Sequence, residues 1–227
     1  MTILTLLFFI TAILYSSIGF GGGSTYLALL LIWKIPYYIF PIIALLCNII
    51  VVSGNSYNYI RAGNHNFKLL IPFLIGSIPF AFFGGTLIIN EEIFEILLFV
   101  VLLIAGILLL INNKSYEEDY LILKKLNFSI SFAIGSILGL VSGIIGIGGG
   151  IFLSPILFLL KAGLPKHIVT TSSIFILINS VAGIAGQFTK SNVFNDILEY
   201  WYLLFFVLFG GQLGNYLNLK ILPTRFL

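Results

Sequence analysis

The sequence predicts an all-α polytopic membrane protein, and two observations carry this prediction. Of the 227 residues, 59% are hydrophobic and only 8% are charged, whereas a soluble domain averages about 25% charged residues. The mean hydropathy is +1.14, and the apolar residues form long continuous runs. A transmembrane β-barrel would instead show apolar residues alternating with a period of two.

Seven runs without a charged residue are each long enough to cross a hydrocarbon core about 30 Å thick. They cover residues 2–33, 35–60, 69–90, 96–113, 126–160, 168–189 and 200–219. We therefore expect about seven transmembrane segments in a multi-pass protein of a cell membrane, of the bacterial inner-membrane type. If each run crosses once, the basic residues of the connectors favour a cytoplasmic N-terminus and a cytoplasmic 112–125 segment.

A glycine-rich stretch occurs twice, at residues 19–23 (Gly-Phe-Gly-Gly-Gly) and at residues 146–150 (Gly-Ile-Gly-Gly-Gly). Each stretch lies inside a run that would form a helix roughly 50 Å long if it were continuous, which exceeds the thickness of the bilayer core. We therefore expect each helix to break at its glycines. Broken backbone is tolerated in lipid only where it is buried in protein or lines a cavity.

The two stretches belong to two similar halves of the chain. The spacing of 127 residues that relates Gly19 to Gly146 also relates the next three glycines and relates Lys34 to Lys161. We predict a first membrane repeat at residues 1–111, a polar linker at 112–125 and a second repeat at 126–227. Repeats of this kind are typical of transporters whose substrate binds at the repeat interface. Four crossings in each half would make the repeats parallel, whereas a hairpin at each glycine break would make them inverted, and the sequence leaves both open.

The first half contains a fourth run, residues 96–113, that has no counterpart in the second half. We therefore expect the last helix of a four-plus-four arrangement to be absent, which would leave an apolar groove for lipid or a second protomer. The expected partners are a small anionic substrate, the lipid bilayer and a second copy of the chain in a homo-oligomer. The scattered net charge of +3 gives no support for nucleic-acid binding.

The glycine stretches resemble the TauE/SafE family of membrane anion permeases, which are described as sulfite exporters. The family pattern is a duplicated Gly-x-Gly-Gly-Gly followed by an apolar run with a proline. Residues 143–155 of the second half match this pattern through Pro155, and residues 165–172 resemble the polar start of the family's next helix. Residues 17–24 match in the first half, which lacks the proline. The resemblance covers nearly the whole chain and implies membrane transport of a sulfur oxyanion or an organosulfonate.

The candidate substrate-binding residues offer hydrogen-bond donors for an anion. Backbone N–H groups of the glycine stretches, next to a helix N-terminus, would form an anion cradle, although close helix packing through small residues is an equally favoured role. Hydroxyl and amide side chains of the neighbouring runs would complete the site, with interhelical hydrogen bonding as their alternative role. The candidates are Gly21, Gly22, Gly23, Asn48, Gly148, Gly149, Gly150, Thr171, Ser172 and Asn179.

Lys34, Arg61 and Lys161 are candidates for attracting an anion towards this site. The alternative roles are an interfacial anchor for Arg61 and ordinary loop charges for the two lysines. We expect no enzyme activity, catalytic residue, metal or cofactor, because the sequence lacks the motifs and membrane-embedded acidic residues that an intramembrane enzyme needs. A non-transporting membrane scaffold or assembly subunit is the main alternative function, and an intramembrane enzyme is less favoured.

Overall fold

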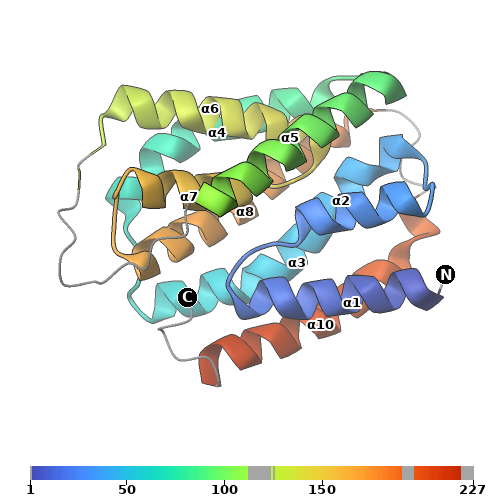
Figure 1. Cartoon of the computed structure of the whole chain (residues 1–227), viewed down its shortest axis with the longest axis horizontal. Helices are drawn as coiled ribbons and strands as arrows, with labels where there is room; N and C mark the ends of the chain where they lie inside the picture. The colour runs from blue at the N-terminus through green and yellow to red at the C-terminus, as the bar shows by residue number, and fades with distance from the viewer. Residues whose placement is uncertain (1, 112–123, 125, 191–196, 221–227) are drawn as a thin grey trace.

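The computed structural model describes residues 2–111, 124, 126–190 and 197–220. Over these residues the regular elements are nine α-helices and one short 3-10 helix, with no strand (Figure 1). By length and apolar composition, four helices of the described chain can each cross a membrane alone: α3 together with η1, α4, α6 and α8. The prediction of an all-helical polytopic membrane protein is therefore confirmed.

The first half contains α1 (Thr2–Ser17), α2 (Gly23–Ile32), η1 (Tyr37–Ile39), α3 (Phe40–Arg61), α4 (Phe67–Thr86) and α5 (Glu91–Ile111). The second half contains α6 (Phe128–Ile145), α7 (Gly150–Leu159), α8 (Pro165–Gln187) and α10 (Trp201–Lys220). Asparagine side chains cap three of these helices, because the Oδ1 atoms of Asn66, Asn90 and Asn127 accept backbone N–H groups at the starts of α4, α5 and α6.

Both long glycine-containing runs break at their glycines, as the sequence predicts. The first run divides into α1 and α2, and the fifth divides into α6 and α7. Just beyond the ends of α1 and α6, Gly19 and Gly146 adopt φ values of +85° and +95°. This left-handed conformation ends a helix and is readily adopted only by glycine.

Contacts at interface glycines show the relative direction of α4 and α6. A methyl group on Gly135 of α6 would overlap the backbone of Phe73 in α4, and one on Gly143 would overlap that of Ala81. The contact positions advance together along both chains, so α4 and α6 run parallel and their backbones are in close contact.

Glycines also lie at the interface between α1 and α10. A methyl group on Gly210 of α10 would overlap the backbone of Phe9 in α1, and one on Gly214 would overlap that of Ile13. These two helices are therefore parallel as well. Each of the two parallel pairs joins one helix of the first half to one helix of the second.

The helices α3 and α8 lie side by side in opposite directions. Ser56, near the end of α3, contacts Ser173, near the start of α8, with their Oγ atoms 3.1 Å apart. Towards the other ends of these helices, Leu45 of α3 lies beside Gly183 of α8. The two central helices are therefore antiparallel.

Helices at equivalent places in the two halves run in opposite directions. The equivalent pairs are α1 with α6, α3 with α8, and α4 with α10. The first group, α1, α3 and α10, runs one way and the second group, α4, α6 and α8, runs the other way (Figure 1). This arrangement is inverted, which is one of the two alternatives that the sequence left open. The repeat boundaries stay a prediction, and nearly all of the 112–125 linker lies outside the described residues.

The bundle has two opposite ends, an N-terminal face and a linker face. At the N-terminal face, α1, α3, α5 and α10 begin and α4 and α8 end. At the linker face, α5 ends and α6 and α8 begin (Figure 1). The short helices α2 and α7 start inside the bundle, and they run to the N-terminal face and the linker face respectively.

Basic residues are concentrated at the linker face, which carries Arg61, Lys68, Lys124, Lys161 and Lys166. The basic residues described at the N-terminal face are Lys34 and Lys190. The positive-inside rule therefore favours a cytoplasmic linker face and an N-terminus outside. The linker side agrees with the one expected from single crossings, whereas the N-terminus changes sides, because two of the seven runs fold back on themselves.

Cysteine labelling in intact cells checks this orientation. Cys47, the chain's single cysteine, is buried, so background reaction with a membrane-impermeant maleimide is low. Glu92→Cys, at an exposed position of the N-terminal face, is expected to label in intact cells. Ala62→Cys, at an exposed position of the linker face, is expected to label only after permeabilisation. The reverse pattern would restore a cytoplasmic N-terminus.

Candidate functional site

The two glycine breaks approach each other in the middle of the helix bundle. The first enters from the linker face, where Gly19 lies beside the last turn of α3. The second enters from the N-terminal face, where Gly146 lies beside the first turn of α3. They meet where Gly23 packs against the backbone carbonyl of Ile147. We call this meeting point, with the flanking Gly21 and Gly148, the crossing.

Asn48 of α3 connects the two breaks. Its Nδ2 donates a hydrogen bond of 3.0 Å to the carbonyl of Ile147, and the side chain is fully buried. A methyl group on Gly21, Gly23 or Gly148 would collide with the Asn48 amide. One first-half side chain therefore contacts the glycine breaks of both halves, and glycine is the only residue that leaves room for it.

The N-termini of two short helices lie at the crossing. Helix α2 begins at Gly23 and helix α7 begins at Gly150, and the glycines that precede them supply no side-chain cap. Neither helix has an acidic residue in its first turn. Helix N-termini present free N–H groups and a partial positive charge. Two such ends converging in a buried core favour an anion there.

Polar side-chain atoms without a hydrogen-bond partner accumulate in the buried core of the described chain. Such an atom costs about 1–3 kcal/mol when it is left unsatisfied, so a group of them points to a ligand or to a second conformation. Within the membrane-spanning helices they are Tyr26 OH, Asn48 Oδ1, Asn55 Oδ1, Ser142 Oγ, Thr171 Oγ1, Ser172 Oγ, Ser180 Oγ and both amide atoms of Asn179.

Helix α8 contributes five of these unpaired atoms, from four side chains, and one of its faces lines the crossing. Ser172, Ile176 and Ser180 are four residues apart and share one face of the helix. A methyl group on Gly148 would lie 3.0 Å from Ile176 Cγ2 and 3.2 Å from Ser180 Oγ. Ile176 also packs against Gly150. In this structure the isoleucine side chain fills the space in front of both breaks.

Two other amides stabilise the helix ends next to the breaks. Asn55 Nδ2 donates to the carbonyl of Ser16 in the last turn of α1, at 2.9 Å. Gln187 Nε2 donates to the carbonyl of Gly143 in the last turn of α6, at 2.8 Å. Carbonyls at a helix C-terminus lack an intrahelical partner, so these side chains supply one in each half.

The family's sequence pattern, described as Sulfite exporter TauE/SafE, matches residues 4–227 of the chain. The chain belongs to the TauE/SafE family. The predicted resemblance is therefore confirmed over nearly the whole length. Membership supports membrane transport as the general activity of this TauE/SafE protein and leaves its substrate open.

Three relatives of this TauE/SafE protein carry the description "probable membrane transporter protein". The one from Sinorhizobium fredii is 25% identical over 227 residues, covering 99% of this chain and 90% of the relative. The one from Methanocaldococcus jannaschii is 30% identical, covering 96% and 86%. The one from Bacillus subtilis is 25% identical, covering 96% and 89%. No solved structure matches the chain.

The structure places the predicted site residues of this TauE/SafE protein in two groups. Asn48 and all six candidate glycines lie at or next to the crossing, and most of these residues are fully enclosed. The side chains of Thr171, Ser172 and Asn179 are buried on α8 and have no hydrogen-bond partner among the residues that the structure describes. Their role as substrate ligands stays a prediction.

The three candidate cations of the TauE/SafE protein lie away from the crossing. Lys34, Arg61 and Lys161 are exposed at the two faces of the bundle. Lys34 and Lys161 follow α2 and α7 with φ values of 53° and 51°, a left-handed conformation that glycine usually occupies. The two related lysines therefore adopt the same unusual backbone conformation at opposite ends of the molecule.

Sequence reasoning missed two residues that bear on the site. Ile176 is one of several isoleucines in an apolar run, and no sequence pattern shows which of them contacts the glycine breaks. Lys190 is a single connector lysine, but its Nζ donates to Gln187 Oε1 at 2.9 Å. A signal for Lys190 existed in its spacing of three residues from Gln187, because a turn that follows a helix end can bring such side chains into contact.

Proposed function

We propose that this protein transports a small anion, a sulfur oxyanion or an organosulfonate, through a site at the crossing. The observation that carries the proposal is the convergence of the α2 and α7 N-termini on a core rich in unpaired hydrogen-bond donors. An anion in low-dielectric surroundings is stable only if donors replace its hydration shell. Backbone N–H groups, hydroxyls and an amide supply such donors here.

The side-chain donors that this proposal assigns to the anion are electrically neutral. Asn179 offers Nδ2, and Thr171, Ser172 and Ser180 offer hydroxyls, all buried on α8. The charged residues that the structure describes lie at the helix ends and connectors. A neutral donor site binds the anion without holding it as an ion pair, which favours release as well as binding. The choice of a sulfur-containing anion is supported by the family description alone.

The inverted arrangement supports alternating access. Each glycine break enters from a different face, and Ile176 fills the space where they meet. Rocking of one inverted repeat against the other opens a central site first to one side and then to the other in transporters of this type. The closed crossing corresponds to a state in which neither entrance reaches the site.

Asn179→Leu tests the proposal, because both amide atoms of Asn179 are buried and unpaired. Removing an unsatisfied amide is expected to leave the protein equally stable or to stabilise it by about 1–2 kcal/mol. Uptake of radiolabelled sulfite and organosulfonate into proteoliposomes is expected to fall at least tenfold per folded molecule. Stability is read from thermal unfolding of the purified protein.

Asn58→Leu is the matched control. Asn58 Nδ2 donates to Asn215 Oδ1 at 3.1 Å, so its loss is expected to lower stability while uptake per folded molecule is retained. Wild-type proteoliposomes that take up neither anion would favour the scaffold alternative. Uptake that persists in Asn179→Leu would exclude this residue from the site.

A further inference from the structure

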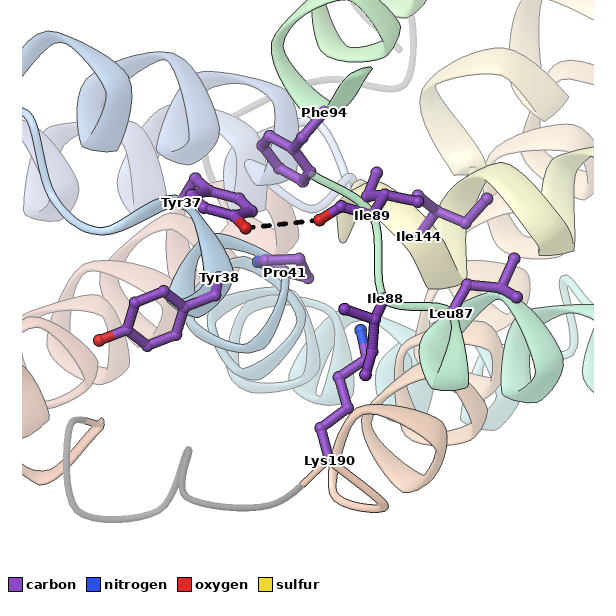
Figure 2. Close-up of a pocket in the computed structure, with 9 residues that line it drawn as sticks. All are labelled: Tyr37, Tyr38, Pro41, Leu87, Ile88, Ile89, Phe94, Ile144 and Lys190. Carbon is purple, nitrogen blue, oxygen red and sulfur yellow. Dashed lines mark hydrogen bonds between the residues drawn. The ribbon is translucent and has the colours of Figure 1, made fainter. Parts of the chain in front are cut away.

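A cavity lies at the N-terminal face, away from the crossing (Figure 2). Its volume is about 210 Å³, which exceeds the roughly 150 Å³ of an apolar cavity that holds benzene. Its walls are η1 with the start of α3, the α4–α5 connection with the first turn of α5, the last turn of α6 and the turn after α8. Four segments that are distant in the sequence therefore enclose it.

Lys190 is the charged residue among those that line the cavity. Its side chain rises from the turn after α8 towards the middle of the lining residues (Figure 2). An ammonium group has three donors, and one of them binds Gln187 Oε1. Among the described residues no carboxylate pairs with it. Burial lowers the pKa of Lys190, which is the expected response of a cation without an anionic partner.

The rest of the lining is mostly apolar and aromatic. Phe94 and Ile144 contribute hydrocarbon surface, and Ile88 is 83% exposed at the rim. The hydroxyl of Tyr37 donates to the carbonyl of Ile89 at 3.4 Å, which secures the α4–α5 connection against the start of α3. A cation at one side and hydrocarbon on the other walls match a ligand with one anionic group and an apolar body.

We propose that this cavity binds small organic monoanions, namely alkanesulfonates and the carboxylates that share their shape. The ammonium of Lys190 binds the anionic group, and the surface of Phe94, Ile144 and Ile88 binds the alkyl chain. Glu91 and Glu92 are exposed in the first turn of α5 and lie outside the lining. The cost of removing an ion from water rises steeply with its charge, and the one ammonium of the lining balances one negative charge, so a monoanion binds better than a dianion.

The ligand could reach the cavity from water or from the bilayer, since the headgroup of an anionic lipid has the same chemistry. Isothermal titration of the full chain in phosphatidylcholine nanodiscs measures the water-borne source, with methane-, propane- and pentanesulfonate and inorganic sulfite as probes. Parallel nanodiscs that contain phosphatidylglycerol measure the lipid source. If the lipid headgroup occupies the cavity, sulfonate binding is lost in the second set only, which supports the same anion chemistry.

Affinity is expected to rise about fourfold for each added methylene until the cavity is full, and sulfite is expected to bind weakest. Lys190→Gln should weaken sulfonate binding about tenfold, the value of a charge-assisted hydrogen bond, whereas Lys68→Gln at the linker face should not change it. Ile88→Gln, at an exposed position that carries little folding risk, should reduce the gain for each methylene.

Affinity that is independent of chain length, or unchanged in Lys190→Gln, would overturn the inference. The inference does not depend on transport through the crossing, because Asn179 does not line this cavity. In the Asn179→Leu background, Lys190→Gln should therefore still weaken propanesulfonate binding about tenfold. Binding without any transport would refute the proposed function and leave this site intact.

Discussion

Replacing Gly148 with alanine is expected to lower anion uptake per folded molecule by roughly 30-fold or more. Gly148 has a φ of +83°, and a methyl group there would lie 2.8 Å from Asn48 Nδ2. Left-handed strain costs about 1–2 kcal/mol, and loss of the hydrogen bond from Asn48 to Ile147 costs about 1 kcal/mol more. A combined penalty of ~2 kcal/mol or more on the transport step gives that fall in rate.

Gly139→Ala is the matched control for this prediction. A methyl group on Gly139 would overlap the backbone of Ser77 in α4, at the α4–α6 interface and away from the crossing. This variant is expected to lose folded yield, read by size-exclusion fluorescence, and to keep uptake per folded molecule. If Gly148→Ala loses yield but keeps uptake, the glycines at the crossing serve packing alone.

Ile176→Ala is expected to lower stability by about 2–5 kcal/mol, the usual cost of truncating a buried isoleucine. Ile176 is 2% exposed and packs against Gly21, Gly148 and Gly150. Its truncation leaves space in front of both glycine breaks. Competition uptake is therefore expected to shift towards larger organosulfonates, by roughly 15-fold for two additional methylenes.

Ile168→Ala separates the two effects of this truncation. Ile168 is on the same helix and is fully buried, but it lies near the linker face, beside Gly163. It should lose comparable stability with no change in the preference between small and large anions. A shift of the same size in both variants would mean that loosened packing, and not the space at the crossing, sets the preference.

The sequence predicts much of the fold, because membrane helices have a strong local signal. The length of the runs without charged residues identifies the membrane spans. The two glycine stretches identify the breaks, since a continuous helix would be longer than the bilayer core is thick. The sequence could not distinguish parallel from inverted repeats. The orientation of the repeats depends on whether α2 and α7 turn back after the breaks, and this is set by the backbone conformation at residues 18–22 and 146–149.

Some residues of the candidate site could be predicted from their type, whereas the place of others depends on how the helices pack. Asn48 and the glycines stand out because amides and glycine clusters are rare in apolar runs. The role of Ile176 depends on which side of α8 faces the breaks, and an apolar run with no polar face does not fix this rotation. Lys34 and Lys161 share a repeat position, yet inversion places them at opposite faces, so they cannot form one cationic site.

The neutrality of the crossing has a consequence for energetics in a polarised membrane. A monoanion that passes this region alone moves one elementary charge through the membrane potential, worth about 2.3 kcal/mol per 100 mV. If the cell interior is negative, the membrane potential drives the anion outwards. A potential of about 100 mV sustains an outside-to-inside concentration ratio of roughly 50-fold. With the linker face in the cytoplasm, an anion exported by the proposed route would leave at the N-terminal face, beside the cavity that Lys190 lines.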